Sequence, residues 1–549
     1  MALHMVDDPD NQDDYVDNNT GGGGGNSGGG GGGLNIGGLL SFLPLVFGLF
    51  KGRGNRGTPN SDGSQPKRGC GLKTILMVAL AIFLIWKFMP AGCNPLNSLT
   101  GEGGANKNFS ESGYNFDAEQ TRKAQVYEGL EDDNTKNPLP EMVNLAAFAP
   151  SRQNQGKQGS CVAWSSAYAA RTILEAASTK QDPNSIAYSP AYMYNSIALE
   201  DCQGSYIQKA MEFMQQNGAV RYQDFRYDEN DCSRQANGTL IQQGQQNKIH
   251  GFHRLTETDD VNGLNIRAIK EHLAKDAPVV IGMMVGGTFM QDMLGQKVWH
   301  PTNSDKNMTG FGGHAMCVIG YDDRVEGGAF QIMNSWGPEW GQNGIGYVRY
   351  GDFKEFTREA YGLDPLPKRG AALNAAFEAS VGLFNPETRT NVALKSAGGN
   401  LFKTVSPIKK GSKFKIEIKN AVECYIYIFT PDVAGKSSVL FPYKPAHSPY
   451  CGITGFRLFP RKESIQADEI GNKEEMGVVV SKTKLDYNAL NAAINASTKP
   501  NFASKLNDAV AANAITNVSF NNGANGSMNF KSTGDAKNIV ACVVEIDKQ

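Results

Sequence analysis

A glycine-rich turn at residues 155–165, with the sequence QGKQGSCVAWS, delivers one cysteine to the start of an apolar stretch. The residues at 167–177 are mostly alanine, leucine and isoleucine and include neither proline nor glycine. This composition predicts a helix that begins near Ser160, with Cys161 in its first turn. The partial positive charge at a helix N-terminus favours thiolate over thiol. We therefore expect Cys161 to have a lowered pKa and to act as a nucleophile.

A base for this nucleophile is found far downstream. Gly313 and His314 precede an apolar run at 315–321, which predicts a buried strand. A second predicted strand, at 329–333, leads into Asn334. An asparagine carbonyl beside an imidazole fixes the ring, so that the other ring nitrogen can face a thiol. The pattern therefore indicates a nucleophile, a base and an orienting group.

In this order the motifs resemble those of the papain-like cysteine peptidases, over about residues 139–350. His314 follows Cys161 by 153 residues and Asn334 follows it by 173, somewhat more than the roughly 130 to 150 that is typical of the family. The resemblance implies that Cys161 is the nucleophile, His314 the general base and acid, and Asn334 the orienting residue. It also implies that the Gln155 side-chain amide and the backbone N–H of Cys161 bind the developing oxyanion.

The same resemblance implies a two-lobe α+β fold, with a helical lobe and a β-barrel-like lobe, and a substrate cleft. Trp336 matches a tryptophan that shields the hydrogen bond between histidine and asparagine from water. The turn at 202–205 matches one that borders the cleft, where Gly204 and Ser205 would offer backbone groups to an extended peptide. Gly313 is a further expected substrate-binding residue.

Nine cysteines do not form a dense disulfide framework. Cys202 and Cys232 stand where the family has bridge-forming cysteines, and we expect them to pair with each other. Such a bridge closes a loop of about 30 residues and contributes roughly 3 to 4 kcal/mol; two free thiols are the alternative. A zinc half-site at His314 and Cys317 has no second pair at ligand spacing, so we expect no metal and no cofactor, and Cys317 is interpreted as strand core.

The N-terminal part of the chain differs sharply in composition from the rest. Residues 1–33 are acidic and then glycine-rich, which predicts a disordered tail. Residues 34–71 are apolar and then basic, and residues 72–89 are an apolar run bounded by lysines, which predicts a transmembrane helix. Residues 90–138 are polar and are interpreted as a tether.

The charges around residues 72–89 predict an orientation in the membrane. Lysine and arginine are frequent in the segment before this run, whereas the segment after it contains acidic residues. By the positive-inside rule, the N-terminus is cytoplasmic and the catalytic domain is periplasmic or extracellular, with a single crossing. The interrupted apolar stretch at 34–50 is the alternative second span or an interfacial segment.

Beyond the predicted peptidase domain at 139–365, the pattern changes. Residues 366–405 are expected to be a linker, with a connecting helix at 371–379. Residues 406–549 show alternating apolar positions, which predict a β-sandwich-like domain. Residues 414–485 also resemble, more weakly, a bacterial accessory domain known only as a domain of unknown function. The residues that carry this likeness are Tyr425, Ile426, Tyr427, Gly435, Leu440, Phe441, Pro442 and the run at 476–480.

These features predict a membrane-anchored cysteine endopeptidase that hydrolyses peptide bonds through a thioester acyl-enzyme. The net charge of −2 gives no reason to expect nucleic acid as a partner. The expected partners are a polypeptide substrate, the membrane and a protein that binds the C-terminal domain. Three alternatives are open: a transpeptidase that uses the same acyl-enzyme, an inactive scaffold that binds peptides, and a β domain that carries the function while the peptidase matures its own linker.

Overall fold

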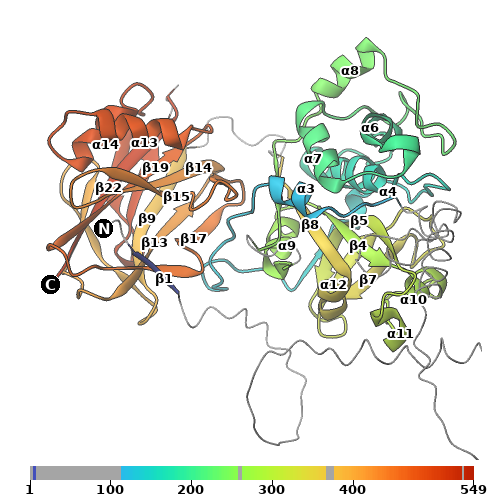
Figure 1. Ribbon diagram of the computed structural model, residues 1–549, viewed down its shortest axis with the longest axis horizontal. Helices are drawn as coiled ribbons and strands as arrows, with labels where there is room; N and C mark the ends of the chain where they lie inside the picture. Colours follow the sequence, from blue (N-terminus) through green and yellow to red (C-terminus); the bar gives the residue numbers. More distant parts are fainter. Residues whose placement is uncertain (1–3, 8–112, 258–262, 367–375, 534–536) are drawn as a thin grey trace, which may run out of the picture. The chain divides into compact units, whose positions relative to one another are not determined.

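The computed structural model describes residues 4–7, 113–257, 263–366, 376–533 and 537–549 (Figure 1). The predicted transmembrane helix at 72–89 and the apolar stretch at 34–50 lie outside these residues. In the part of the chain that is described, no helix is both long enough and apolar enough to cross a membrane.

A continuous helical stretch forms the centre of one lobe. It consists of α4 (Cys161–Ala163), the π-helical segment η4 (Trp164–Arg171) and α5 (Thr172–Thr179). Around it lie α6 (Pro190–Ile197), α7 (Ile207–Gln216) and α8 (Gly238–Gln245) (Figure 1). Ala167, Ala170 and Ile173 are fully buried, so small and apolar residues form part of the packed face of this stretch. The helix expected to begin near Ser160 is therefore present.

An antiparallel sheet forms the second lobe. Its strands lie in the order β3 (Phe252–Arg254), β8 (Thr357–Leu363), β4 (Val279–Val285), β5 (Gly312–Asp322), β6 (Ala329–Met333) and β7 (Ile345–Arg349), with β2 (Met142–Asn144) on β5. Cys317 in β5 is paired with Met333 in β6. This register brings His314, near the start of β5, close to Asn334, which directly follows β6.

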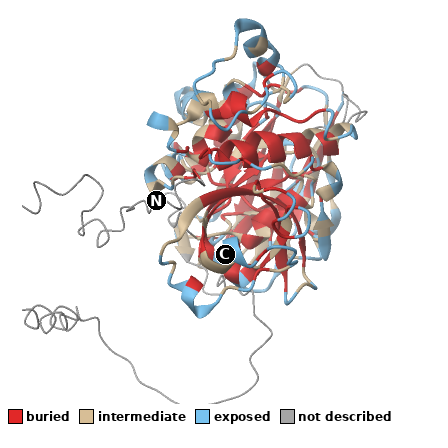
Figure 2. Ribbon diagram, turned by 90° about the vertical axis from the view of Figure 1, so that its right-hand side faces the viewer, coloured by how far each residue is buried: buried red, intermediate tan, exposed pale blue. Residues whose placement is uncertain are grey.

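Shorter helices and turns complete this region. They are η3 (Ala146–Phe148), η5 (Glu200–Cys202), α9 (Ile266–Leu273), α10 (Gly287–Gln291), α11 (Asn303–Lys306) and α12 (Tyr350–Phe356). A disulfide joins Cys202 to Cys232, as the resemblance implied. Buried residues, red in Figure 2, fill the interior, and exposed ones lie at the periphery.

The C-terminal domain contains two sheets. The first has the order β1 (His4–Asp7), β18 (Glu463–Gln466), β13 (Lys413–Asn420), β9 (Phe377–Asn385), β21 (Met528–Ser532) and β20 (Val518–Asn522), with β10 (Thr390–Val392) on β9 and β17 (Gly455–Phe459) on β13. The second has the order β11 (Leu394–Ser396), β12 (Leu401–Thr404), β22 (Ile539–Asp547), β19 (Lys473–Ser481), β14 (Cys424–Pro431) and β15 (Ser437–Phe441), with β16 (Tyr450–Cys451) on β14.

Both sheets contribute to one apolar core, in a sandwich-like arrangement. Ile416 from the first sheet and Val478 and Val544 from the second are fully buried in it. Helices α13 (Tyr487–Ala496) and α14 (Phe502–Val510) lie side by side on the second sheet (Figure 1). Their residues Ile494 and Leu506 belong to a separate apolar cluster with strand residues of that sheet.

Strand β1 corrects the prediction that residues 1–33 are a disordered tail. It pairs antiparallel with β18, from His4 opposite Gln466 to Asp7 opposite Glu463. Met5 packs against the sandwich core. The residue pattern at positions 4–7 does not predict this strand, because an edge strand offers backbone hydrogen bonds to almost any extended segment.

The expected linker at 366–405 is also wrong. Residues 377–404 contain four strands, and β9 lies in the middle of the first sheet. The burial of β9 alternates along the strand, with Phe377, Ala379 and Val381 pointing into the core. Of the helix expected at 371–379, residues 371–375 lie outside the described residues and residues 377–379 belong to strand β9, since period-two burial outweighs the helix propensity of alanine.

Within the polar tether expected at 90–138, residues 113–138 are described by the structure and are folded. They contain helix α3 (Ala118–Lys123), whose N-terminus is capped by the Asp117 side chain. Tyr114, Tyr127 and Leu130 are buried. These apolar residues follow neither a helical nor a strand period, so the polar residues between them dominated the prediction.

Arg457 is a buried cation that joins this N-terminal segment to the β domain. Its guanidinium donates to the carbonyl of Glu128 at 3.0 Å, to Asn420 Oδ1 at 2.7 Å and to the carbonyl of Ile453 at 2.7 Å. The side chain is fully buried. Losing it would leave buried acceptors without this donor, a change that costs several kcal/mol in proteins.

We expect Arg457→Met to lower the free energy of unfolding by roughly 3 kcal/mol, measured by urea denaturation. Lys462→Met is the control, because Lys462 forms an ion pair with Glu257 while its side chain is 48% exposed, and such pairs contribute less than about 1 kcal/mol. Equal stability losses in the two variants would contradict this account of Arg457.

Candidate active site

Cys161 stands at the N-terminus of α4 and is fully buried. Its Sγ accepts a hydrogen bond from the backbone N–H of Ala315 at 3.4 Å. Burial raises the pKa of Cys161 to about 12, although backbone N–H groups act in the opposite direction. The predicted lowering of this pKa is therefore wrong for this structure, because desolvation of the thiolate outweighs the helix N-terminus.

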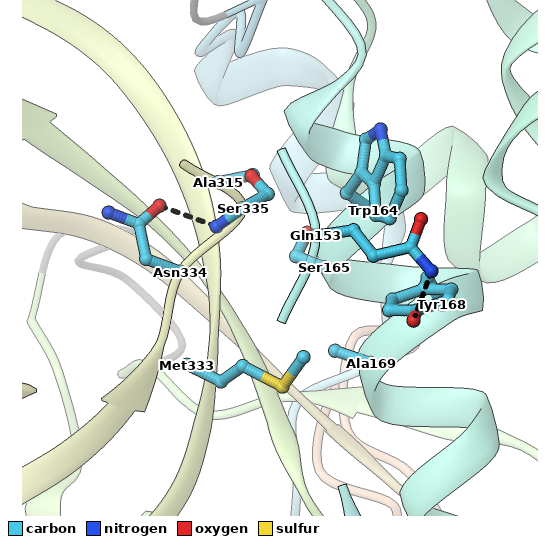
Figure 3. A pocket seen from close by; sticks show the side chains of 9 residues that line it. All are labelled: Gln153, Trp164, Ser165, Tyr168, Ala169, Ala315, Met333, Asn334 and Ser335. Atoms are coloured by element: carbon cyan, nitrogen blue, oxygen red, sulfur yellow. Dashed lines mark hydrogen bonds between the residues drawn. The ribbon is translucent and has the colours of Figure 1, made fainter. Parts of the chain in front are cut away.

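His314 and Asn334 form the expected pair. The ring Nε2 lies 2.7 Å from Asn334 Oδ1. The same oxygen accepts the backbone N–H of Ser335 at 2.7 Å (Figure 3). Because Oδ1 can only accept, Nε2 must carry the proton. Nδ1 then holds a lone pair, and this buried atom has no hydrogen-bond partner among the described residues. Burial lowers the pKa of His314 to about 4, so a neutral imidazole is poised to accept a proton.

Trp336 covers this pair. Its ring stacks on the His314 imidazole, with centroids 4.3 Å apart and planes inclined by 22°. An indole face in this position restricts rotation of the imidazole and keeps water away from the Nε2 hydrogen bond. The geometry is the one that the resemblance implied.

Gln155 connects the two halves of the site. Its Oε1 accepts from Ser335 Oγ at 2.7 Å, and its Nε2 donates to the carbonyl of Gln158 at 3.0 Å. The amide is thereby held between the turn that precedes Cys161 and the segment that follows β6. Sequence reasoning did not select Ser335, and its place directly after the candidate Asn334 is the only sequence signal for it.

A small internal pocket lies behind these residues, between the helix and the ends of β5 and β6 (Figure 3). It is lined by Gln153, Trp164, Ser165, Tyr168, Ala169, Ala315, Met333, Asn334 and Ser335. Neither Cys161 nor His314 lines it, so it is not the substrate cleft. In the described part of the chain, no three His, Cys, Asp or Glu side chains are grouped so that they could hold a metal ion.

The chain itself occupies the expected cleft. The backbone N–H of Ser205 donates to the carbonyl of Gly113 at 2.9 Å, and the backbone N–H of Asn115 donates to the carbonyl of Ser205 at 3.0 Å. These bonds make Tyr114 the parallel partner of Ser205. Ser205 thus pairs with an extended segment of the chain itself, at residues 113–115, and its role toward a substrate stays a prediction.

The backbone of Gly204 does not take part in this pairing. Its N–H donates to the Tyr194 hydroxyl at 3.3 Å, and its carbonyl accepts from the N–H of Leu199 at 2.9 Å. The prediction that Gly204 offers its own backbone is corrected in this respect. Gly204 instead leaves room for the segment at residues 113–115, because a Cβ at Gly204 would lie 2.3 Å from the carbonyl oxygen of Gly113.

The same segment passes close to the neighbours of both candidate catalytic residues. A Cβ on Gly113 would lie 1.8 Å from the carbonyl oxygen of Gly159, and a Cβ on Gly313 would lie 2.5 Å from the carbonyl oxygen of Tyr114. Gly313 thus leaves room for the backbone of this segment, and its role toward a substrate stays a prediction. Cys161 and His314 are 0% exposed, so the site is closed in this structure.

Two buried histidines predict a loss of stability in acid. Burial lowers the pKa of both His314 and His272 to about 4, below the ordinary value of about 6.5. Between pH 6.5 and 4 the unfolded chain therefore binds more protons, so stability is fully present above pH 6.5 and is lost as the pH falls through this window. We expect the midpoint of unfolding to fall less between pH 6.5 and 4 in His272→Gln than in the wild-type protein. His300→Gln, whose side chain is 57% exposed, should leave this fall unchanged. A midpoint that is constant from pH 7 to 4.5 would contradict this.

A buried thiol at a helix N-terminus, together with an imidazole oriented by an asparagine, defines a site of the thiol acyl-transfer class. Residues 142–361 match the model of the papain family cysteine proteases. This part of the chain is similar to that family.

The relatives found by comparison include one protein of an animal and one of a plant. Cathepsin K of Mus musculus is 28% identical over 194 residues, which are 35% of this chain and 54% of the cathepsin. Vignain of Vigna mungo is 27% identical over 203 residues, which are 36% of this chain and 49% of vignain. The chain thus spans about half the length of these relatives. Among solved structures, xylellain, a cysteine protease from Xylella fastidiosa, is 21% identical with a TM-score of 0.39, covering 47% of this chain and 96% of xylellain.

Proposed function

We propose that the chain is a cysteine endopeptidase that hydrolyses peptide bonds with Cys161, His314 and Asn334. The observation that carries the proposal is the hydrogen bond from His314 Nε2 to Asn334 Oδ1, at 2.7 Å. It fixes the tautomer in which Nδ1 can take a proton, and the thiol is held at the backbone of Ala315, the next residue in the chain.

The reaction begins when the thiol proton passes to His314 Nδ1 and Sγ attacks the carbonyl carbon of the substrate. The carbon–nitrogen bond then breaks, and the imidazolium returns the proton to the leaving amine. A thioester acyl-enzyme results. Water attacks this thioester and gives one proton to His314, which protonates the departing Sγ, so that a carboxylic acid is released and the thiol is restored. Gln155 and the backbone N–H of Cys161 are the proposed oxyanion donors.

A covalent trap tests the proposal. A peptide epoxide is expected to alkylate Cys161 in the wild-type protein, detected by intact mass and peptide mapping, and to leave Cys161→Ala unmodified. A Cys161 that stays unmodified after the cleft has been opened by Tyr114→Ala would favour the scaffold alternative. Mass analysis of the products, in the presence of an added amine, separates hydrolysis from transpeptidation.

We also propose that residues 72–89 attach the protein to a membrane, with the peptidase domain outside the cytoplasm. The apolar run and the basic segment before it support this. The disulfide between Cys202 and Cys232 is consistent with an oxidising compartment. Membrane fractionation of the full chain, compared with a variant that lacks residues 72–89, tests the attachment; equal release into the soluble fraction would refute it.

A further inference from the structure

The turn at residues 155–160 carries both proposed oxyanion donors. The Gln155 side-chain amide stands at its start, and the backbone N–H of Cys161 directly follows its end. Gly156, within the turn, has a φ of 64°, in the left-handed region that favours glycine. Two donors stabilise an oxyanion only if both lie within hydrogen-bond reach of the same oxygen. Whatever fixes the shape of this turn therefore sets the spacing of the two donors.

The hydroxyl of Tyr227 joins the two ends of the turn. It donates to the carbonyl of Gln155 at 2.6 Å, and it lies 2.6 Å from Ser160 Oγ. Because the phenol has one proton, which goes to the carbonyl, Ser160 donates to the phenol oxygen. Burial raises the pKa of Tyr227 to about 12, so the phenol keeps its proton at neutral pH. One oxygen atom thus bridges the residue that supplies the first donor and the residue that precedes the second.

The ring of Tyr227 is anchored on the helix that carries the thiol. It packs edge-on against Trp164, with centroids 4.9 Å apart and planes inclined by 74°. Trp164 is 2% exposed and begins η4, directly after the short helix α4 that starts at Cys161. This packing does not involve the hydroxyl. The ring therefore places the hydroxyl, and the hydroxyl alone makes the bridge across the turn.

Residues 227–232, which we call the strap, also contact the middle of the turn. The carboxylate of Glu229 accepts the backbone N–H of Lys157 at 2.6 Å. A Cβ on Gly156 would lie 1.8 Å from Glu229 Oε2, so the strap packs directly on the turn. Cys232, at the end of the strap, forms the disulfide. The strap is thus held covalently at one end and by the phenol at the other.

We propose that Tyr227 is a positioning residue of the peptidase reaction, whose hydroxyl holds Gln155 and the backbone N–H of Cys161 at the spacing that the oxyanion requires. This inference rests on the proposed function and deepens it. When Sγ attacks, the carbonyl oxygen of the substrate gains negative charge, and the donors must already face it. Without the hydroxyl, the carbonyl of Gln155 and the side chain of Ser160 lose their common partner, and the turn can widen. The loss falls on the transition state and not on the bound substrate, so it lowers kcat and leaves KM nearly unchanged.

The test uses the full chain with Tyr114→Ala, which opens the cleft, as the parent, and adds Tyr227→Phe. Phenylalanine keeps the ring on Trp164 and removes only the hydroxyl. For the fluorogenic peptide that the parent cleaves best, we expect kcat to fall about ten-fold, with KM within about two-fold of the parent value. Alkylation of Cys161 by iodoacetamide should change by less than about two-fold, because this displacement develops no oxyanion.

Tyr222→Phe, made in the same parent, is the matched control. The Tyr222 hydroxyl donates to Gln153 Oε1 at 3.0 Å, which is a tyrosine hydrogen bond of the same kind just outside the turn. Both tyrosines are half-buried. We expect Tyr222→Phe to retain the kcat of the parent. Thermal midpoints are measured for both variants, so that folding and catalysis are read separately.

A double-variant cycle shows whether Tyr227 acts through the oxyanion donors. Gln155→Ala removes one donor and is expected to lower kcat about 100-fold. With one donor left, the spacing no longer matters. Tyr227→Phe should therefore lower kcat by less than about two-fold in the Gln155→Ala background, the non-additivity expected of groups that act as a unit.

The outcomes separate this inference from the proposed function. The inference alone is overturned by an unchanged kcat in Tyr227→Phe, by an equal loss in Tyr222→Phe, by a parallel fall of hydrolysis and alkylation, or by a loss in the Gln155→Ala background as large as in the parent. If the parent neither hydrolyses any peptide nor reacts with a peptide epoxide at Cys161, the proposed function fails and the inference fails with it.

Discussion

Cys161→Ala is expected to reduce peptide hydrolysis by roughly 10³-fold or more, to the level of the background reaction. The reason is that Sγ is the only proposed covalent acceptor of the acyl group, and a methyl group cannot replace it. His314→Ala should have a comparable effect, because the thiol has a pKa of about 12 in its buried position and hardly ionises at neutral pH without a base. The measurement is turnover of a mixed fluorogenic peptide library by the full chain and its variants.

Cys317→Ala provides a matched control for this experiment. Cys317 lies on β5, the strand of His314, and is equally buried, and desolvation raises its pKa too. Its side chain packs in the core of the domain. The control should therefore retain hydrolysis while it removes a buried thiol from the same strand. Comparable losses in Cys161→Ala and Cys317→Ala would mean that packing, and not nucleophilic chemistry, accounts for the result.

Tyr114→Ala is expected to increase the rate at which iodoacetamide alkylates Cys161 at pH 7, on the order of 100-fold. The substitution removes the buried side chain of Tyr114 and weakens the packing of residues 113–115 in the cleft. Water can then reach the sulfur of Cys161. Desolvation is the main cause of the raised thiol pKa, and its relief returns that pKa toward the ordinary value of about 8.5. The rate is followed by mass spectrometry of the peptide that contains Cys161.

Phe116→Ala is the control for this second prediction. Phe116 lies two residues after Tyr114 but is 37% exposed. Its loss should change the alkylation rate little. If the two variants are alkylated equally slowly, the segment at residues 113–115 does not limit access to the thiol.

The sequence predicted the candidate cluster because each of its members lies in a local motif. Cys161 follows a glycine-rich turn, and His314 and Asn334 lie at the ends of predicted strands; their catalytic roles stay predictions. The place of residues 113–115 was not predictable in this way. Tyr114 and Ser205 lie far apart in the sequence, and nothing near either residue indicates that a polar-looking segment folds back into the cleft. The boundaries of the β domain were not predictable either, because alanine residues obscured the alternation of buried and partly buried positions in β9.

The pairing of β1 with β18 bears on the proposed attachment to a membrane, because it would limit how an anchored form of this chain crosses a bilayer. Hydrogen bonds between the two strands require that residues 4–7 and the C-terminal domain share one aqueous compartment. Both apolar stretches, 34–50 and 72–89, lie between them in the sequence. One crossing would separate the two strands, whereas two crossings would return the chain to its starting side as a hairpin with the basic residues at its bend. A membrane form that keeps β1 in place therefore has an even number of spans, and its N-terminus lies on the same side as the peptidase domain.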